Sequence, residues 1–417
     1  MAMAAPAQTI SVLHHFGTNE MGVYPQSPLV RGADGTLYGM TAAGGALGQG
    51  QVFKFDPGGA GYTALKNFSH IDGAGASSVL LLSGQTLYGT TERGGLFDQG
   101  TIFQVKTDGS GFDVLHHFSA LNESDSGTFT NLDGAKPFAG LALAGGFLFG
   151  TAPEGGINGS GTIFRLNPDG SDYTVLHAFS DFSSGTNAEG AVPYADLLFE
   201  AGYLYGTASI GGTHGVGTIF RLQPDGSDWT VLHHFPALEA APAGWTNSDG
   251  AWPSAGLVAS GGVLYGNCHE GGPFAYGTVY KLNPDGTGFS VLKSFDLLSE
   301  PAGPDGLLVA VGDTLFGVMA SPDSFSGGVY RLHRDGSGFA VIKSFSNWLY
   351  GAAPSRGLAL VGSKLYGTTP DGGTFNYGTL FELSVDGSNF RVLTNFSGGD
   401  GTVPQGGLAI AEDVFYG

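Results

Sequence analysis

Short runs that alternate between apolar and polar residues recur along this chain at a nearly constant spacing. The tripeptide Leu-Tyr-Gly, or a close variant of it, marks each recurrence, and its copies begin at Leu37, Leu87, Leu148, Leu204, Leu264, Leu315, Leu365 and Phe415. By subtraction, successive copies start 50, 61, 56, 60, 51, 50 and 50 residues apart. A self-similar unit of about 40–50 residues is typical of propellers and solenoids. The repeat therefore predicts one body of stacked units rather than several domains.

Each unit contains four short stretches with the composition of β-strands. In the second unit and its continuation these stretches are residues 87–90, 101–105, 112–118 and 140–143. They are rich in β-branched and aromatic residues, and turn signals separate them, as at Asp108-Gly109. No stretch has the 3.6-residue period of a helix. Four antiparallel strands per unit predict the blade of an all-β propeller.

The order of the strands in a blade predicts two different faces. The small, apolar stretch at residues 140–143 suits the crowded axis and is strand A, followed outward by Leu-Tyr-Gly (strand B), residues 101–105 (strand C) and residues 112–118 (strand D). An up-and-down order puts the short A–B and C–D turns on one face. The B–C and D–A loops, which vary in length, lie on the other face, and we expect function there.

The strand count favours eight blades. The eighth blade would combine residues 407–408 and 415–417 with residues 11–16, and it would lack strand C. A seven-bladed ring with leftover strands is the alternative. Under either count, residues 10–417 are predicted to form a single propeller domain. Residues 1–9 are interpreted as a leader remnant, because Ala2-Met3-Ala4 resembles the Ala-x-Ala end of a secretory signal.

Composition and charge exclude several classes of partner. The 417-residue chain has a formal net charge of −20 and only 16 Lys and Arg residues, so nucleic acid and anionic membranes are poor partners. Cys268 is the one cysteine, which excludes an intramolecular disulfide and a cysteine-based zinc site. No apolar run reaches 18 residues, so no membrane span is expected. No metal site and no cofactor are predicted.

The repeated motif resembles a known family. In the second unit its parts are Leu87-Tyr88-Gly89-Thr90-Thr91, Gly94-Gly95, Gly100-Thr101-Ile102-Phe103, Asp108-Gly109-Ser110 and Val114-Leu115-His116. These parts, in this order, resemble the GloVer-type tandem repeat of secreted bacterial choice-of-anchor proteins. The resemblance covers almost the whole chain. It implies a β-propeller that is exported or displayed on the bacterial surface, and it implies no catalytic residue set.

The B–C loops hold the candidate catalytic groups, which are Glu92, Glu154, His214, His269, Glu270 and Asp371. Two carboxylates about 5–10 Å apart could hydrolyse a glycosidic bond. A histidine base beside Arg93 or Lys136 would suit a lyase acting on a uronate. The run Cys268-His269-Glu270 holds a nucleophile, a base and an acid, but neighbours on an extended segment point to opposite sides.

Aromatic residues of the same face are the candidate ligand contacts, together with Arg93. Phe97, Phe274 and Phe375 follow the Gly-Gly pair of their loops and could form a platform around the channel mouth, or could only pin the loops. Trp245 and Trp252 lie in one long D–A loop. Long D–A loops follow three consecutive blades and are predicted to build a raised wall. The recurrent histidines of strand D are interpreted as scaffold.

Three functions are compatible with this pattern. The favoured one is a secreted or surface-displayed module that binds a polysaccharide or another surface glycan on the loop face. The alternative is a carbohydrate-active enzyme, a glycoside hydrolase or polysaccharide lyase, with its site at the same channel mouth. The third is an assembly protein that associates with itself through the open edge of the incomplete blade.

Overall fold

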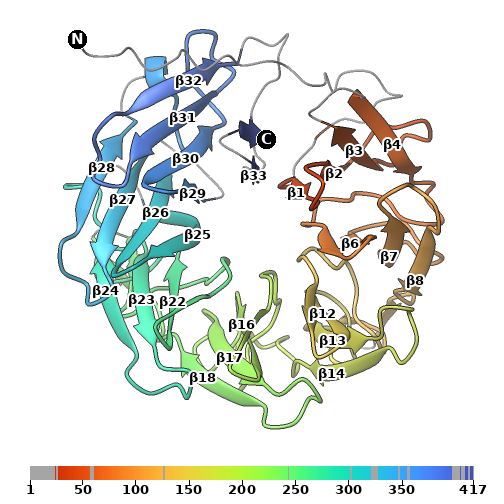
Figure 1. Cartoon of the computed structure of the whole chain (residues 1–417). Coiled ribbons are helices and arrows are strands. Elements are labelled where there is room, and N and C mark those ends of the chain that lie inside the picture. Colours follow the sequence, from red (N-terminus) through yellow and green to blue (C-terminus); the bar gives the residue numbers. More distant parts are fainter. Residues whose placement is uncertain are drawn as a thin grey trace.

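The computed structural model describes most of the chain as a ring of β-sheets (Figure 1). It describes residues 24, 27–56, 61–124, 127–242, 244–300, 303–320, 327–345, 348–354, 357–396, 404, 409–411 and 414–416. The predicted leader at residues 1–9 and the predicted strand at residues 11–16 lie outside these ranges. The described part contains one helical segment, the short 3-10 helix Trp348–Tyr350. No helix of the described part is long and apolar enough to cross a membrane.

Seven four-stranded antiparallel sheets form the blades, each with its strands in chain order from the axis outward. Blades 1 and 2 comprise β1 (Val30–Arg31), β2 (Leu37–Thr41), β3 (Gln51–Asp56), β4 (Gly61–Asn67), and β5 (Leu81–Ser83), β6 (Thr86–Thr91), β7 (Thr101–Lys106), β8 (Asp113–His117). Blades 3 and 4 comprise β11 (Ala142–Ala144), β12 (Phe147–Ala152), β13 (Thr162–Leu166), β14 (Thr174–Ala178), and β15 (Leu198–Glu200), β16 (Tyr203–Ala208), β17 (Thr218–Leu222), β18 (Thr230–His234).

The remaining blades repeat the pattern. Blades 5 and 6 comprise β21 (Val258–Ser260), β22 (Val263–Cys268), β23 (Thr278–Leu282), β24 (Ser290–Ser294), and β25 (Gly303–Val311), β26 (Thr314–Ala320), β27 (Gly327–His333), β28 (Ala340–Ser344). Blade 7 comprises β29 (Ala359–Val361), β30 (Lys364–Thr369), β31 (Thr379–Ser384) and β32 (Arg391–Asn395). The prediction of an all-β propeller with strands A to D in this order is confirmed.

The number of complete blades is seven, so the alternative count is favoured over the eight predicted. The described residues of the last repeat copy form a two-stranded sheet, β33 (Ala409–Ala411) with β34 (Val414–Tyr416). β33 lies between β29 and β1 and contacts both (Figure 1). A full eighth blade needs strands C and D as well, and the described part of the chain supplies neither at this position. Self-association through the edge of this sheet stays a prediction.

The two predicted faces are present. Residues of the D–A loops pair with residues of the B–C loops through isolated bridges, as Ala135 does with Glu154 and Ala251 with Glu270. These two kinds of loop therefore share one face, which we call the loop face. The short A–B and C–D turns lie on the opposite face.

Leu-Tyr-Gly recurs because each of its residues has a packing role. The leucine is fully buried between neighbouring blades, as Leu204 is between blades 3 and 4, where Phe149 and Ile163 belong to the same cluster. The glycine leaves room for an aromatic ring of strand C. A Cβ added at Gly206 would lie 2.5 Å from Cζ of Phe220. Every complete blade places an aromatic residue of strand C over this glycine in the same way.

Two blades place a tyrosine at this buried position of strand C, and its hydroxyl has no hydrogen-bond partner among the described residues. These tyrosines are Tyr280 and Tyr330, where the other blades carry phenylalanine. We expect Tyr280→Phe to raise the free energy of unfolding by about 1 kcal/mol, because a buried unpaired hydroxyl is costly. Chemical denaturation measures the change. Tyr205→Phe is the control, because that hydroxyl lies beside Arg221; an equal gain there would contradict the explanation.

Polar contacts near the axis join blades 2, 3, 4 and 5 each to the next blade. The hydroxyl of Thr90 on β6 donates to the carbonyl of Ala139 in blade 3 at 3.2 Å. In blade 5 the equivalent residue is Asn267, and its amide donates to the carbonyl of Gly306 at 2.8 Å. The departure from Thr-Thr at Asn267-Cys268 is therefore explained by the fold. Cys268 itself is fully buried, which raises the pKa of its thiol well above the usual value and makes it a poor nucleophile.

The recurrent histidines of strand D join the blades on the outer side. The ring of His116 stacks on Tyr173 of the next blade, with centroids 3.7 Å apart, and its Nε2 lies 2.9 Å from Oδ2 of Asp133. His177 with Trp229 and Glu189, and His233 with Phe289 and Asp249, repeat this arrangement. The histidines are thus held between a carboxylate and an aromatic ring in each interface. This position accounts for their recurrence.

Acid should weaken these outer contacts. Burial alone would raise the pKa of Asp133, but hydrogen bonds from His116 and Ser119 outweigh it and lower this pKa below 3.8. A lowered carboxyl pKa adds stability above pH 3.8 that is lost as the pH falls through the folded-state value. We expect Asp133→Asn to cost about 2 kcal/mol at pH 7 and progressively less below pH 4. Denaturation at several pH values tests this, with the exposed Asp113→Asn as control.

Candidate functional site

The D–A loops enter the inner strands through a strained backbone turn. Lys136, Val192 and Trp252 each precede a proline and have φ values of 55°, 61° and 54°. Their amides donate to the B–C loop of the previous blade, as Lys136 does to the carbonyl of Gln99 at 2.8 Å. A left-handed backbone is costly for these residue types, so the hydrogen bonds must hold it in place. The turn fixes where the next two residues emerge on the loop face.

Two aromatic side chains emerge side by side at this point in blades 3 and 4. Phe138 follows Lys136 by two residues, and Tyr194 follows Val192 by the same interval. Their ring centroids are 6.0 Å apart and the planes are nearly perpendicular, at 89°. Phe138 is 38% exposed and Tyr194 43% exposed, although aromatic rings are usually buried. The equivalent residues of blades 2 and 5 are Ser77 and Ser254.

Charged groups surround this aromatic pair. Nζ of Lys136 lies 2.8 Å from Oε2 of Glu154, and both side chains are partly exposed. Burial raises the pKa of the Tyr194 phenol, and the charges of Glu154 and Glu92 raise it further. We call Phe138, Tyr194, Lys136, Glu154 and Glu92 the rim cluster.

Asp196 lies two residues beyond Tyr194, close to the axis. Its Oδ1 accepts a hydrogen bond from the amide of Gly140 at 2.7 Å. Blades 3 and 5 have the glycines Gly140 and Gly256 at this position. Asp196 is exposed at the surface, but the protein groups around it limit its hydration, and this raises the pKa of its carboxyl above the usual 3.8. Asp196 thus adds an acid beneath the rim cluster.

The other predicted acid and base residues do not join this cluster. Glu270 and Asp371 occupy the position of Glu154 in blades 5 and 7, where they bridge to Ala251 and Ala352. The ring of His269 contacts the carbonyl of Pro304, with Nδ1 at 3.3 Å. His214 is exposed. It lies near His234, which ends the outer strand of the same blade. In the described residues no three acidic, histidine or cysteine side chains are grouped as a metal site would require.

The predicted aromatic platform is not at the axis. The amide of Leu96 donates to Nδ1 of His117 on the outer strand β8, and the amide of Thr374 donates to Asn395 on β32. The Gly-Gly half of the B–C loop therefore reaches outward over its own blade in blades 1, 2, 4 and 7. Phe97, Phe274 and Phe375 are exposed there on blades 2, 5 and 7, apart from one another and from the rim cluster. Their role as ligand contacts stays a prediction.

The long D–A loops after blades 2, 3 and 4 lie on the loop face, and the wall predicted for them stays a prediction. Two of them form hairpins, β9 (Asn122–Glu123) with β10 (Phe129–Thr130), and β19 (Glu239–Ala241) with β20 (Gly244–Thr246). Each loop rests on the B–C loop of the following blade, as Phe129 does on Gly159. Trp245 on β20 is 61% exposed. Trp252 is instead packed against the core between blades 4 and 5, so its main contacts are structural.

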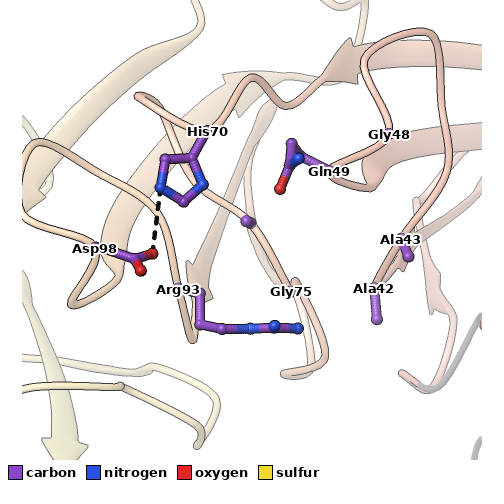
Figure 2. A pocket seen from close by; sticks show the side chains of 9 residues that line it. Ala42, Ala43, Gly48, Gln49, His70, Gly75, Arg93 and Asp98 are labelled. Carbon is purple, nitrogen blue, oxygen red and sulfur yellow. Dashed lines mark ion pairs between the residues drawn. The ribbon is translucent and has the colours of Figure 1, made fainter.

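A pocket of about 310 Å³ opens between blades 1 and 2 on the loop face. Ala42, Ala43, Gly48 and Gln49 of the blade 1 B–C loop, His70, Ala74 and Gly75 of the following D–A loop, and Arg93 and Asp98 of blade 2 line it. Figure 2 shows Arg93 extending below Gly75, with His70 and Gln49 across the hollow. Of these residues only Arg93 was predicted from the sequence.

Comparison with known proteins settles the family. The sequence profile of the Gloeobacter/Verrucomicrobia repeat matches three overlapping segments, residues 1–181, 123–328 and 241–417, which together cover the chain. The chain belongs to the Gloeobacter/Verrucomicrobia repeat family. The predicted resemblance is thereby confirmed, and the seven blades show how the Gloeobacter/Verrucomicrobia repeat folds here. No curated protein matches the chain.

Solved structures share the fold of this Gloeobacter/Verrucomicrobia repeat protein. A proposed 6-phosphogluconolactonase of Bacteroides fragilis has a TM-score of 0.52 and 15% identity, covering 89% of this chain and 96% of its own. A proposed 6-phosphogluconolactonase of Bacteroides uniformis has a TM-score of 0.50 and 15% identity, covering 89% and 97%. A puromycin-hydrolysing peptidase of Mycobacterium tuberculosis has a TM-score of 0.51 and 10% identity, covering 90% of this chain and 55% of its own. At such identities the likeness concerns the fold alone.

Proposed function

We propose that this protein is an exported binding module that takes a neutral carbohydrate on the rim cluster. The observation that carries the proposal is the exposed, perpendicular pair of Phe138 and Tyr194. Exposed aromatic rings with a few convergent polar groups are typical of small-ligand sites. One ring face of a sugar carries C–H groups that pack on an aromatic face, while its edge carries hydroxyls.

The polar groups beside the rings suit such hydroxyls. Lys136 supplies N–H donors, and Glu154 and Glu92 supply carboxylate acceptors. The ion pair between Nζ of Lys136 and Oε2 of Glu154, at 2.8 Å, orients both side chains beside the rings. The net charge of −20 favours a neutral glycan over an anionic polymer at this carboxylate-rich rim.

The same groups define the alternative function. Glu92 and Glu154 lie at neighbouring positions of the B–C loops of blades 2 and 3, so a glycoside hydrolase using these two acids is the second candidate. Binding without turnover is expected for the module, whereas a hydrolase would release new reducing ends.

A panel of neutral oligosaccharides separates the two candidates. We expect isothermal titration calorimetry to detect binding of at least one neutral glycan and a reducing-end assay to detect no turnover. Turnover that Glu154→Gln abolishes while binding persists would establish the hydrolase instead. If no neutral glycan on the panel binds, the proposed function is wrong.

A further inference from the structure

We propose that the pocket between blades 1 and 2 is a second, separate site that binds the carboxylate group of a ligand. The proposal does not depend on the carbohydrate site of the rim cluster. It rests on the pocket itself, on the guanidinium of Arg93, which forms an ion pair with none of the described residues, and on the donors that face it.

Four lining residues form a set of side chains that no other blade repeats. Where blade 2 has Arg93, the five other blades that have a Gly-Gly pair carry Ala43, Glu154, Ile210, Glu270 and Asp371. Where it has Asp98, they have Gly48, Gly159, Gly215, Ala275 and Asn376. The third position is His70, replacing the asparagines Asn131, Asn187 and Asn247. The fourth is Gly75, replacing Lys136, Val192 and Trp252. Most of these positions differ from blade to blade, so the fold requires no particular residue there, and this pocket has a combination of side chains of its own.

His70 ties the D–A loop to the B–C loop through its backbone, whose carbonyl accepts a hydrogen bond from the amide of Gly95 at 2.8 Å. In blade 3, Oδ1 of Asn131 accepts hydrogen bonds from the amides of Gly134 and Gly156, at 2.9 and 2.8 Å, and so ties the two loops together. The side chain of His70 makes no such contact, and its Nε2 instead lies 3.4 Å from Oδ1 of Asp98. Both side chains are well exposed, so this ion pair contributes little to stability.

Arg93 is the group that would hold an anion. Its side chain is exposed, and none of the described residues forms an ion pair with it. A Cβ added at Gly75 would lie 3.4 Å from its Nε, so the small residue leaves the guanidinium open to the pocket. A guanidinium presents two parallel N–H groups that match a carboxylate. Gln49 and His70 add N–H donors across the hollow (Figure 2).

The charge balance of the pocket favours a carboxylate over a phosphate. One arginine neutralises a single negative charge, and Asp98 at the other side of the pocket would repel a dianion. The volume of about 310 Å³ is at the lower end of the range for small-molecule sites. The carboxylate could belong to a uronic acid or to the C-terminus of a short peptide, because both present the same singly charged group.

Calorimetry on the whole chain tests the site with matched ligands. The probes are glucuronate against glucose, N-acetylglycine against its amide, and inorganic phosphate. We expect at least one carboxylate to bind and its neutral partner not to bind, and whichever carboxylate binds identifies the source. Arg93→Gln should weaken that binding at least tenfold. Arg93→Lys should weaken it less, because lysine keeps the positive charge and loses only the two parallel N–H groups of the guanidinium.

Two controls make the result decisive. Arg334→Gln removes an arginine from the opposite face and should leave binding unchanged, as should Phe138→Ala with Tyr194→Ala on the rim cluster. The proposal is overturned if neither carboxylate binds, if phosphate binds more tightly than both, if Arg93→Gln binds as the parent does, or if the rim variant loses binding. Failure of neutral glycans to bind would concern only the proposed function.

Discussion

Replacing Gly206 by valine is expected to lower the free energy of unfolding by about 3 kcal/mol. The new Cβ would lie 2.5 Å from Cζ of Phe220, well inside van der Waals contact, with Leu197 at 3.0 Å on the other side. Overpacking a core in this way typically costs about 1–3 kcal/mol, and the upper end applies where the neighbours cannot move.

The Phe220 ring has little room to move. It is fully buried, and its centroid lies 5.0 Å from that of Trp229 and 5.5 Å from that of Phe179. His177 stacks on Trp229, so a shift of the Phe220 ring would disturb the interface between blades 3 and 4. The same reasoning applies to the glycine of every Leu-Tyr-Gly copy in the seven blades.

A substitution at a second glycine distinguishes the cost of steric crowding from the cost of backbone strain. A Cβ at Gly185 meets nothing within 4 Å, but its φ is +85°. We therefore expect Gly185→Ala to cost only the left-handed strain, about 1 kcal/mol. Chemical denaturation midpoints compare the two variants. Equal losses would mean that the ring over Gly206 does not explain the conserved tripeptide.

Removing both rings of the rim cluster is expected to weaken glycan binding about hundredfold. Truncating a central aromatic anchor commonly costs more than 1 kcal/mol, and 1.4 kcal/mol corresponds to a factor of ten. Phe138→Ala with Tyr194→Ala removes two such anchors at once. Both rings are more than a third exposed, so the fold should persist, and unchanged unfolding midpoints would verify this.

The matched control uses exposed rings elsewhere on the same face. Phe97→Ala with Phe375→Ala removes two phenylalanines that reach outward over blades 2 and 7. We expect glycan affinity to stay within about twofold of the parent protein. If this control loses affinity and the rim variant keeps it, the ligand contacts are those predicted from the sequence and not the rim cluster.

The sequence was sufficient to predict the blade and its two faces. The spacing of Leu-Tyr-Gly, the Asp-Gly turns and the alternating stretches are local signals, and local signals determine strands and hairpins. The number of complete blades depends on how the two ends of the chain meet. That contact joins β33 to β1 and β29, which are distant in sequence, so no local pattern reports it.

The rim cluster was missed for a similar reason. Phe138 and Tyr194 lie just before strand A, in a segment where neighbouring blades carry Ser77 and Ser254. The available signal was an aromatic residue directly after Lys136-Pro137 and Val192-Pro193. Its meaning depends on the left-handed turn and on the contact between two blades, 56 residues apart by subtraction. The pairing of Lys136 with Glu154 likewise requires the bridge between Ala135 and Glu154.

The outward course of the B–C loops was equally beyond local pattern. Phe97 follows a Gly-Gly pair, which allows the loop to turn in either direction. Contacts with the outer strand decide that direction, as between Leu96 and His117. The pocket could have been anticipated in part, because Arg93 and His70 visibly break the repeat. Their proximity became evident only from the fold.

A crystal structure of the protein with its best-binding neutral oligosaccharide tests the central claim most directly. The account predicts a sugar ring packed against Phe138 and Tyr194, with its hydroxyls in hydrogen-bond reach of Lys136 and Glu154. A sugar bound on the face of the A–B and C–D turns, or held by Trp245 away from the rim cluster, would contradict it.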